Sequence, residues 1–181
     1  MAQSQNHQAS LKPQDLLVLL AMLARDPANQ DATGYAGLAA HTGLAISAVH
    51  ASIKRAVAAR LAVFQGRRPA LLKTQLREFL IHGAKYVFAP VWSSLTRGVP
   101  TGYAAAPLNT VITPSSDPPP VWPHATGTVR GIGLAPLYPS VPEAALQDAR
   151  LYALLALFDA LRAGQARERE AAVRLLDGYF A

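Results

Sequence analysis

Residues 35–63 constrain the fold of this chain more than any other stretch, because they read as two short helices joined at Gly43. A turn between closely crossing helices needs a residue with positive φ, which glycine adopts without steric cost. On the first helix we expect Leu38 and the small Ala39 to face inward. On the second, the inward positions recur at steps of three and four residues: Leu44, Ile46, Val49, Ile53 and Val57. This pattern predicts a helix-turn-helix.

The second helix, predicted over residues 47–60, carries polar and basic side chains on its outward face. The second helix of a helix-turn-helix enters the major groove of DNA, where hydroxyl, imidazole and ammonium groups hydrogen-bond to bases and methyl groups contact thymine. The helix is sparsely equipped for reading bases, since two of its outward positions are alanines. Its candidate DNA-binding residues are Ser47, Ala48, His50, Ala51, Lys54, Arg55 and Arg60.

The run over residues 38–63 resembles the winged-helix members of the helix-turn-helix superfamily, the MarR-like and IclR-like bacterial regulators. It matches their order of Leu-Ala, three residues, Gly-Leu, and then a Val-His helix ending in Lys-Arg, and the resemblance covers residues 16–72. Ala45 stands where Ser or Thr usually caps the second helix, so we expect Ser47 to supply the cap. Ala51 stands where a basic residue is common, and Arg60 replaces the usual glycine. The resemblance implies a transcriptional regulator, most simply a repressor, that binds double-stranded DNA.

A winged helix continues into a β-hairpin after its second helix. Residues 61–64 and 70–72 can form two short strands, with residues 65–69 as the tip. Arg67 and Arg68 would then meet phosphates or enter a minor groove. The alternative is an ordinary polar turn with two solvated arginines.

Positive charge is concentrated around the predicted DNA-binding segment. Residues 1–100 hold 11 basic and 4 acidic side chains, whereas residues 101–181 hold 6 basic and 7 acidic ones. Between residues 32 and 77 there is no Asp or Glu. Neutralising the DNA backbone requires clustered cations, so this asymmetry favours DNA as the partner.

The composition sets outer bounds on the chain. Its 181 residues suffice for one good hydrophobic core or two small ones, and 51% of them are apolar. Cysteine is absent, which excludes disulfides and thiolate metal sites. We see neither an apolar run of membrane-spanning length nor a signal-peptide core, and we expect a cytoplasmic protein without a membrane partner.

The periodicity along the chain predicts a mostly α (α+β) protein. Helices are expected over residues 11–25, capped by Ser10, and over residues 73–86, 142–163 and 165–176. Prolines and glycines crowd the middle, where we expect loops and short strands, the best candidate being residues 127–137. The predicted organisation is a flexible tail (1–10), a winged helix-turn-helix with a trailing helix (11–86), a packed Pro-rich segment (87–142) and C-terminal helices (143–181).

The C-terminal helices raise the question of a partner. Apolar helices in a small regulator often form a homodimer, since two DNA half-sites require a two-fold protein. Arg167 and Glu170 fall at helical pair spacing, which indicates a solvated face or a recognition surface. An alternative function is an autoregulating antitoxin or adaptor whose C-terminal half binds a partner protein. A further one is a pure protein-interaction domain.

The sequence shows no clear pattern for metal binding or catalysis. His41, His82 and His124 lack metal-ligand spacing, and the acids form no acid/base set with a local nucleophile. Trp92 and Trp122 line a ligand pocket or belong to the core. We therefore predict no catalytic residue, no metal site, no cofactor and no enzymatic activity.

Overall fold

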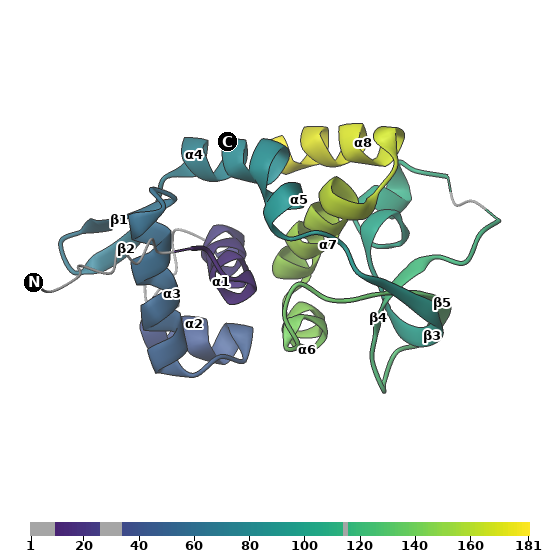
Figure 1. Ribbon diagram of the computed structural model, residues 1–181, viewed down its shortest axis with the longest axis horizontal. Helices are drawn as coiled ribbons and strands as arrows, with labels where there is room; N and C mark the ends of the chain where they lie inside the picture. Colours follow the sequence, from purple (N-terminus) through teal and green to yellow (C-terminus); the bar gives the residue numbers. More distant parts are fainter. Residues whose placement is uncertain (1–9, 26–33, 114–115) are drawn as a thin grey trace, which may run out of the picture.

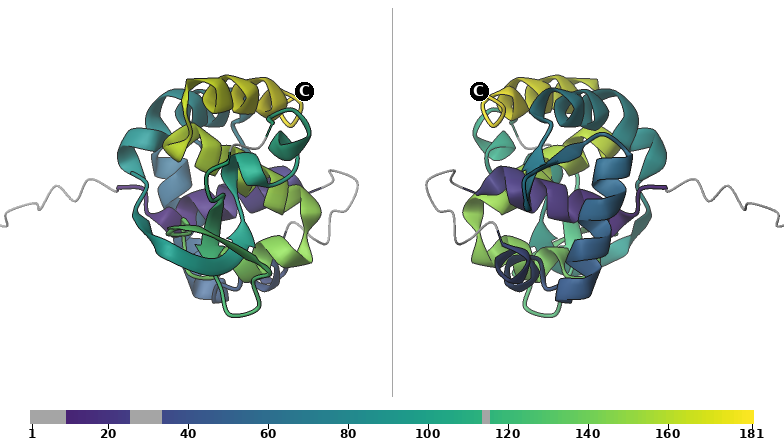
Figure 2. Two further views of the ribbon diagram at one scale, coloured as in Figure 1. Left: turned by 90° about the vertical axis from the view of Figure 1, so that its right-hand side faces the viewer. Right: turned by 90° about the vertical axis from the view of Figure 1, so that its left-hand side faces the viewer.

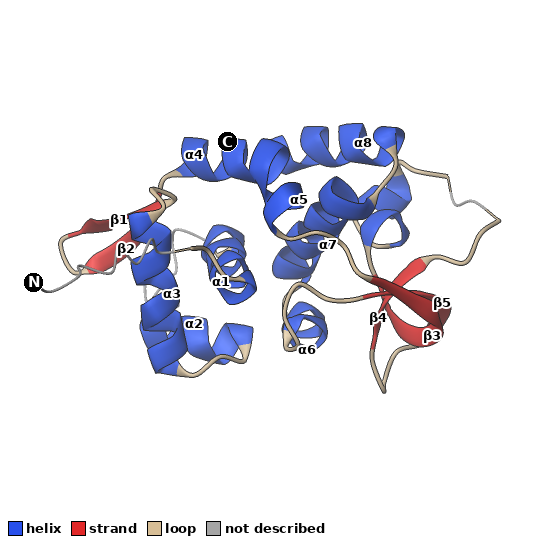
Figure 3. Ribbon diagram, viewed as in Figure 1, coloured by secondary structure: helices blue, strands red, loops and turns tan. Residues whose placement is uncertain are grey.

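The computed structural model describes residues 10–25, 34–113 and 116–181. Helices predominate over strands, so the fold is mostly α with a smaller β component, as predicted (Figure 3). The flexible tail predicted at residues 1–10 lies, except for Ser10, outside the described residues. The N-terminal part consists of three helices followed by a β-hairpin: α1 (Pro13–Ala24), α2 (Tyr35–Thr42), α3 (Ile46–Ala58), β1 (Ala62–Gln65) and β2 (Arg68–Leu71).

Helix α1 lies between α3 and α7 (Ala149–Ala163) and is buried along nearly its whole length (Figure 1). Pro13 occupies its first turn, and the carboxylate of Asp15 accepts a hydrogen bond from the backbone N–H of Lys12 at 2.8 Å. The predicted cap at Ser10 is therefore wrong, because Lys12 precedes the helix and Asp15 reaches back to it. The buried α1 is the central helix of the N-terminal part.

Helices α2 and α3 meet at Gly43. Gly43 has φ 69°, and its N–H donates to the carbonyl of Ala39, which closes α2 in a left-handed turn. The two helices are bent by 105° relative to each other. In the described residues no single helix is long and apolar enough to cross a membrane; α2 and α3 reach that length and composition only when taken together.

Helix α3 begins and ends without the usual capping residues. Ala45 precedes its first turn, and no side chain of the described residues caps it. The predicted cap by Ser47 is wrong, since Ser47 already lies inside the helix as its second residue. Beyond the helix, Arg60 adopts φ 59°, the left-handed conformation that glycine would take at lower cost.

The predicted hairpin is present, with its tip shorter than expected. Strands β1 and β2 pair antiparallel from Ala62 opposite Leu71 to Gln65 opposite Arg68. Gly66, with φ 63°, begins the two-residue turn, as a type II′ hairpin requires. The hairpin projects beside α3 at one end of the molecule (Figure 1).

The helix predicted over residues 73–86 is present in three connected pieces. They are α4 (Lys73–Glu78), a π-helical turn (Phe79–Gly83) and α5 (Ala84–Val87). This segment leads across the molecule to the strands of the Pro-rich middle (Figure 1).

The Pro-rich middle folds into a small closed barrel of three strands. Strand β3 (Trp92–Pro100) pairs antiparallel with both β4 (Pro120–Pro123) and β5 (Val129–Leu134), while β4 and β5 run parallel. The predicted strand within residues 127–137 is confirmed as β5. The barrel is tight, because a Cβ on Gly131 would lie 2.0 Å from the carbonyl oxygen of Pro119.

The C-terminal helices are α6 (Val141–Gln147), α7 and α8 (Ala166–Asp177). The single helix predicted over residues 142–163 is wrong, because the chain becomes extended at Asp148. The carboxylate of Asp148 accepts hydrogen bonds from the N–H groups of Arg150 at 2.7 Å and Leu151 at 3.0 Å, so it starts α7 as a new helix.

One hydrophobic core runs through the molecule and crosses the predicted domain boundaries. Buried side chains of α1, α2, α3, β4, α6, α7 and α8 all belong to it. Every residue of α7 from Ala153 to Leu161 is buried inside the chain. The apolar face of α7 is therefore used within one chain, and the predicted homodimer stays a prediction.

Candidate nucleic-acid interface

Helix α3 lies on the outer surface at the hairpin end of the molecule. Figure 2 (right) views this end, with α3 in front and α1 behind it. One side of α3 faces the core and consists of its buried residues Val49, Ser52, Ile53 and Ala56, and the opposite side faces solvent. The long exposed face and the adjacent hairpin form the α3–hairpin surface, defined here as residues 46–60 and 62–71.

Most of the predicted DNA-binding residues are accessible on this surface. Ala48 and Ala51 are half-buried in α3. The exposed members of the set are Ser47, His50, Lys54, Arg60, Arg67 and Arg68. The structure thus brings the outward side chains of α3 and the two hairpin arginines to one end of the molecule.

Arg55 is the exception among the predicted contacts. Its guanidinium donates to both carboxylate oxygens of Asp15, at 2.7 and 2.6 Å, and is 20% exposed. The hydrogen bonds to Asp15 raise the pKa of Arg55, and they leave the side chain turned toward α1. Arg55 therefore holds α3 in place, and the prediction that it faces DNA is corrected. The sequence offers only a weak hint of this contact, which is the carboxylate of Asp15 in a largely apolar helix, and it does not indicate which basic residue Asp15 contacts.

Three exposed large apolar residues of the surface, Ile46, Val63 and Phe64, had not been assigned to it from the sequence. Ile46 was predicted to face inward, yet it is 56% exposed, because it is the first residue of α3 and lies ahead of the core. Phe64 is 41% exposed on the hairpin. His50, which had been predicted, lies beside Tyr35, with ring centroids 5.2 Å apart. The surface thus combines cations with apolar groups that suit thymine methyl contacts.

The cations near this surface fall into two groups. Arg77 pairs with Asp177 at 2.7 Å, and Lys73 donates to the carbonyl oxygen of Ala181 at 3.4 Å, so both contact the C-terminal part. Among the described residues, Lys54, Arg60 and Arg67 form no ion pair or side-chain hydrogen bond. These three side chains remain available for an anionic partner.

A polar junction connects α2 to the start of α7. His41 Nδ1 accepts hydrogen bonds from Arg25 at 3.2 Å, and its Nε2 lies 2.9 Å from the Asp148 carboxylate. Burial lowers the pKa of His41, and the nearby Arg25 adds to this effect, which together outweigh the attraction of Asp148. Ser140 donates to the carbonyl of Thr42 at 2.6 Å, so the turn between α2 and α3 is also anchored.

The buried Asp159 of α7 is the main polar group of the C-terminal part. It accepts hydrogen bonds from Thr101 at 2.7 Å, from the Trp122 indole at 2.6 Å and from Arg162 at 2.7 Å. Trp122 therefore belongs to the core. Both carboxylate oxygens of Asp159 accept hydrogen bonds, and those from Thr101 and Trp122 hold the barrel region against α7.

No group of three or more His, Asp or Glu side chains suited to a metal ion is present in residues 10–25, 34–113 and 116–181. Comparison with protein-family models, with curated proteins and with solved structures gave no match to this chain.

Proposed function

We propose that this protein binds double-stranded DNA, with α3 in the major groove and the β1–β2 hairpin on the backbone or in the minor groove. The observation that carries the proposal is the α3–hairpin surface, where Lys54, Arg60 and Arg67 are unpaired and α3 is exposed along its length. In many DNA-binding proteins a helix presented in this way enters the major groove.

The arrangement of the elements supports this proposal. The order of three helices and a hairpin matches the winged-helix regulators that the sequence resembles, and the 105° bend between α2 and α3 falls in the range of a helix-turn-helix. The absence of acidic residues in the sequence between residues 32 and 77 keeps the surface free of charges that repel phosphates. A transcriptional repressor is the simplest form of this function.

The test is a titration of the purified protein against DNA from upstream of its own gene, and against a scrambled duplex of equal length, at several salt concentrations. We expect preference for the upstream DNA and an affinity that falls steeply as salt rises, since phosphate contacts release counterions. Equal, weak binding to both duplexes would mean that the surface attracts DNA through its positive charge alone, without reading the sequence. No binding would contradict the proposal.

The second candidate function is that of an antitoxin or adaptor that binds a partner protein. Its support is a set of exposed apolar side chains along the segment from α5 to β3: Tyr86 (77% exposed) and Val87 (53%) in α5, Val91 (63%) in the connection, and Leu95 (48%) in β3. Exposed apolar residues gathered in one segment are typical of protein contacts. Co-purification of the protein from its host with a stoichiometric partner, lost in a Tyr86→Ser/Val91→Ser variant, would support this function. A homodimer through the same segment would instead appear as self-association of the pure protein.

A further inference from the structure

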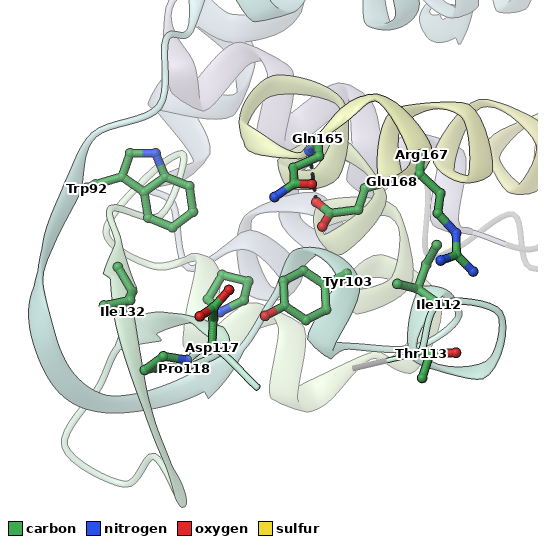
Figure 4. A pocket seen from close by; sticks show the side chains of 11 residues that line it. Trp92, Tyr103, Ile112, Thr113, Asp117, Pro118, Ile132, Gln165, Arg167 and Glu168 are labelled. Carbon is green, nitrogen blue, oxygen red and sulfur yellow. Dashed lines mark hydrogen bonds between the residues drawn. The ribbon is translucent and has the colours of Figure 1, made fainter. Parts of the chain in front are cut away.

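The cleft beside the barrel and the start of α8 shows no preference for one charge on a ligand. Acidic and basic side chains both line it, including Glu168 and Arg167 (Figure 4). Glu168 also accepts the backbone N–H of Gln165 at 3.1 Å, so its carboxylate is engaged within the first turn of α8. A different cleft, nearer the hairpin, is lined by charged side chains of one sign.

This second cleft, called here the β2–α8 cleft, has a volume of about 410 Å³. Its walls come from α1, β2, the first residue of α4, the start of α7 and the residues that follow α8. Residues 178–181 lie close to α4, at the end of the molecule that carries the hairpin (Figure 1). The volume lies in the range of small-molecule sites in proteins.

Three basic residues from distant parts of the sequence line the β2–α8 cleft: Arg25, Lys73 and Arg150. No Asp or Glu side chain is among the described lining residues. Lys73 donates to a main-chain oxygen of Ala181 at 3.4 Å, and the Arg150 guanidinium lies 5.2 Å from the centroid of the Tyr179 ring. Within the described part of the chain, neither Lys73 nor Arg150 pairs with a carboxylate side chain. The cleft therefore attracts anions.

Arg25 has one hydrogen-bond donor without an acceptor. Its Nε donates to His41 Nδ1 at 3.2 Å, and its Nη2 donates to the carbonyl of Gly37 at 2.6 Å, so the side chain is held in place. Its Nη1 is buried and has no hydrogen-bond partner among the described residues. Burial lowers the pKa of Arg25 by more than the attraction of Asp148 raises it, and Asp148 also lies 2.9 Å from His41 Nε2. Because buried donors in proteins normally have an acceptor, Nη1 indicates that one is missing beside the cleft.

The remaining walls of the β2–α8 cleft are mainly apolar. Met22 and Leu23 of α1 line it, as do residues 69–71 of β2. An inorganic anion would leave these side chains without a contact, whereas a hydrocarbon group would remove their apolar surface from water. The cleft therefore suits a molecule with an anionic head group and an apolar body.

We propose that the β2–α8 cleft binds a small organic anion, a carboxylate or a phosphate monoester with an apolar body. The guanidinium groups of Arg25 and Arg150 suit the oxygens of either head group, Lys73 adds positive charge, and the body lies against α1 and β2. The cleft adjoins the α3–hairpin surface through residues 69–71, but its three cations are not those of that surface. The inference therefore does not depend on DNA binding.

Four probes separate the head group from the body: hexanoate, hexyl phosphate, the neutral hexanamide and inorganic phosphate. The chain has two methionines, so NMR of ¹³C-methyl-labelled protein can follow the Met22 signal, which a Met22→Leu variant identifies. We expect hexanoate or hexyl phosphate to shift the Met22 signal saturably, and the tighter of the two identifies the head group. Hexanamide and inorganic phosphate should each bind at least about fivefold more weakly, because the first lacks the charge and the second lacks the apolar body.

A double variant tests the role of the cations. Lys73→Gln/Arg150→Gln removes two positive charges at exposed positions and should weaken binding of the tighter anion about tenfold. Arg25 is kept, because it also holds α2 through Gly37. Arg130→Gln/Arg174→Gln removes the same charge at exposed positions outside the cleft, so it is the matched control and should bind as the parent does.

The proposal is overturned if neither organic anion gives a saturable shift of the Met22 signal, or if hexanamide or inorganic phosphate binds as tightly as they do. It is also overturned if Lys73→Gln/Arg150→Gln binds the anion as the control does. Loss of DNA affinity in this variant, with no binding of either organic anion to the parent, would assign the cations to nucleic acid and overturn the proposal as well.

Discussion

Arg55 of α3 and Asp15 of α1 form a bidentate ion pair, with Arg55 Nε 2.7 Å from Oδ2 and a terminal guanidinium nitrogen 2.6 Å from Oδ1. Asp15 is completely buried and also accepts the backbone N–H of Lys12. The pair fixes α3 against α1 and so determines which side of α3 faces solvent. Arg55 therefore orients the surface without belonging to it.

Replacing Arg55 with alanine should destabilise the fold by about 2–4 kcal/mol, because it leaves the Asp15 carboxylate buried without its partner. This expected loss of stability is smaller than for a fully buried ion pair, since Arg55 is 20% exposed and water can partly replace its guanidinium. Urea unfolding at equilibrium measures the loss. Lys54→Ala, an exposed neighbour, is the control and should change stability by less than about 0.5 kcal/mol. Equal effects of the two substitutions would show that the ion pair does not hold α3.

Serine at position 45 should stabilise the protein by about 1 kcal/mol. Ala45 precedes α3 with φ −65° and ψ 148°, a conformation in which a Ser hydroxyl can accept an N–H of the first turn. Thermal unfolding should show a higher midpoint for Ala45→Ser and no gain for Ala45→Val, which lacks the hydroxyl. If the Ser variant is no more stable than the Val variant, residue 45 does not occupy the capping position of α3.

Glycine at position 60 should also stabilise the protein, by about 1 kcal/mol, because Arg60 holds φ 59° against the steric cost of its Cβ. The same substitution at Ala58, inside α3, should instead cost about 0.5–1 kcal/mol. Unfolding free energies of the two variants should thus change in opposite directions. A loss of stability in both would mean that position 60 is not left-handed in solution.

Stability should decrease as the pH falls below about 6.5, the pKa of a histidine in an unfolded chain. Burial lowers the pKa of His41 in the folded state, so between the two pKa values the unfolded chain binds the proton more strongly. Above both values His41 is neutral in either state, and its contribution no longer depends on pH. His41→Gln should therefore show a smaller loss of unfolding free energy between pH 7.5 and 5 than the parent. The prediction for His41 is contradicted if the free energy of unfolding of the parent falls between pH 7.5 and 5 by no more than that of the variant.

Much of the N-terminal architecture could be predicted because its signals are local. Gly43 marked a turn, the apolar steps marked the helices, and the glycine at position 66 fitted a hairpin. The orientation of Arg55 could not be predicted, since it depends on Asp15, 40 residues earlier. A helical pattern gives the direction of a side chain only approximately. The long side chain of an arginine at the edge of the core can turn toward solvent or toward the neighbouring helix.

In the rest of the chain the missing information was also tertiary. The strand β3 was not recognised, because its residues show no clear alternation and acquire their pairing from β4 and β5. The break at Asp148 was hidden by continuous apolar spacing, although an Asp ahead of an apolar run is a typical helix start. The burial of α7 by α1, α6 and α8 depends on how these helices pack together in three dimensions, so from the sequence alone its apolar face resembled an interface.

The most direct measurement compares DNA binding by the parent protein with that of two charge-reversed variants between 50 and 200 mM salt, by fluorescence anisotropy. Lys54→Glu/Arg67→Glu alters the α3–hairpin surface, and Arg130→Glu/Arg174→Glu makes the same change in charge at exposed positions elsewhere. DNA binding through α3 and the hairpin predicts at least a tenfold loss of affinity and a shallower salt dependence for the first variant, with the second within about threefold of the parent. Equal affinities of the two variants for DNA would contradict it.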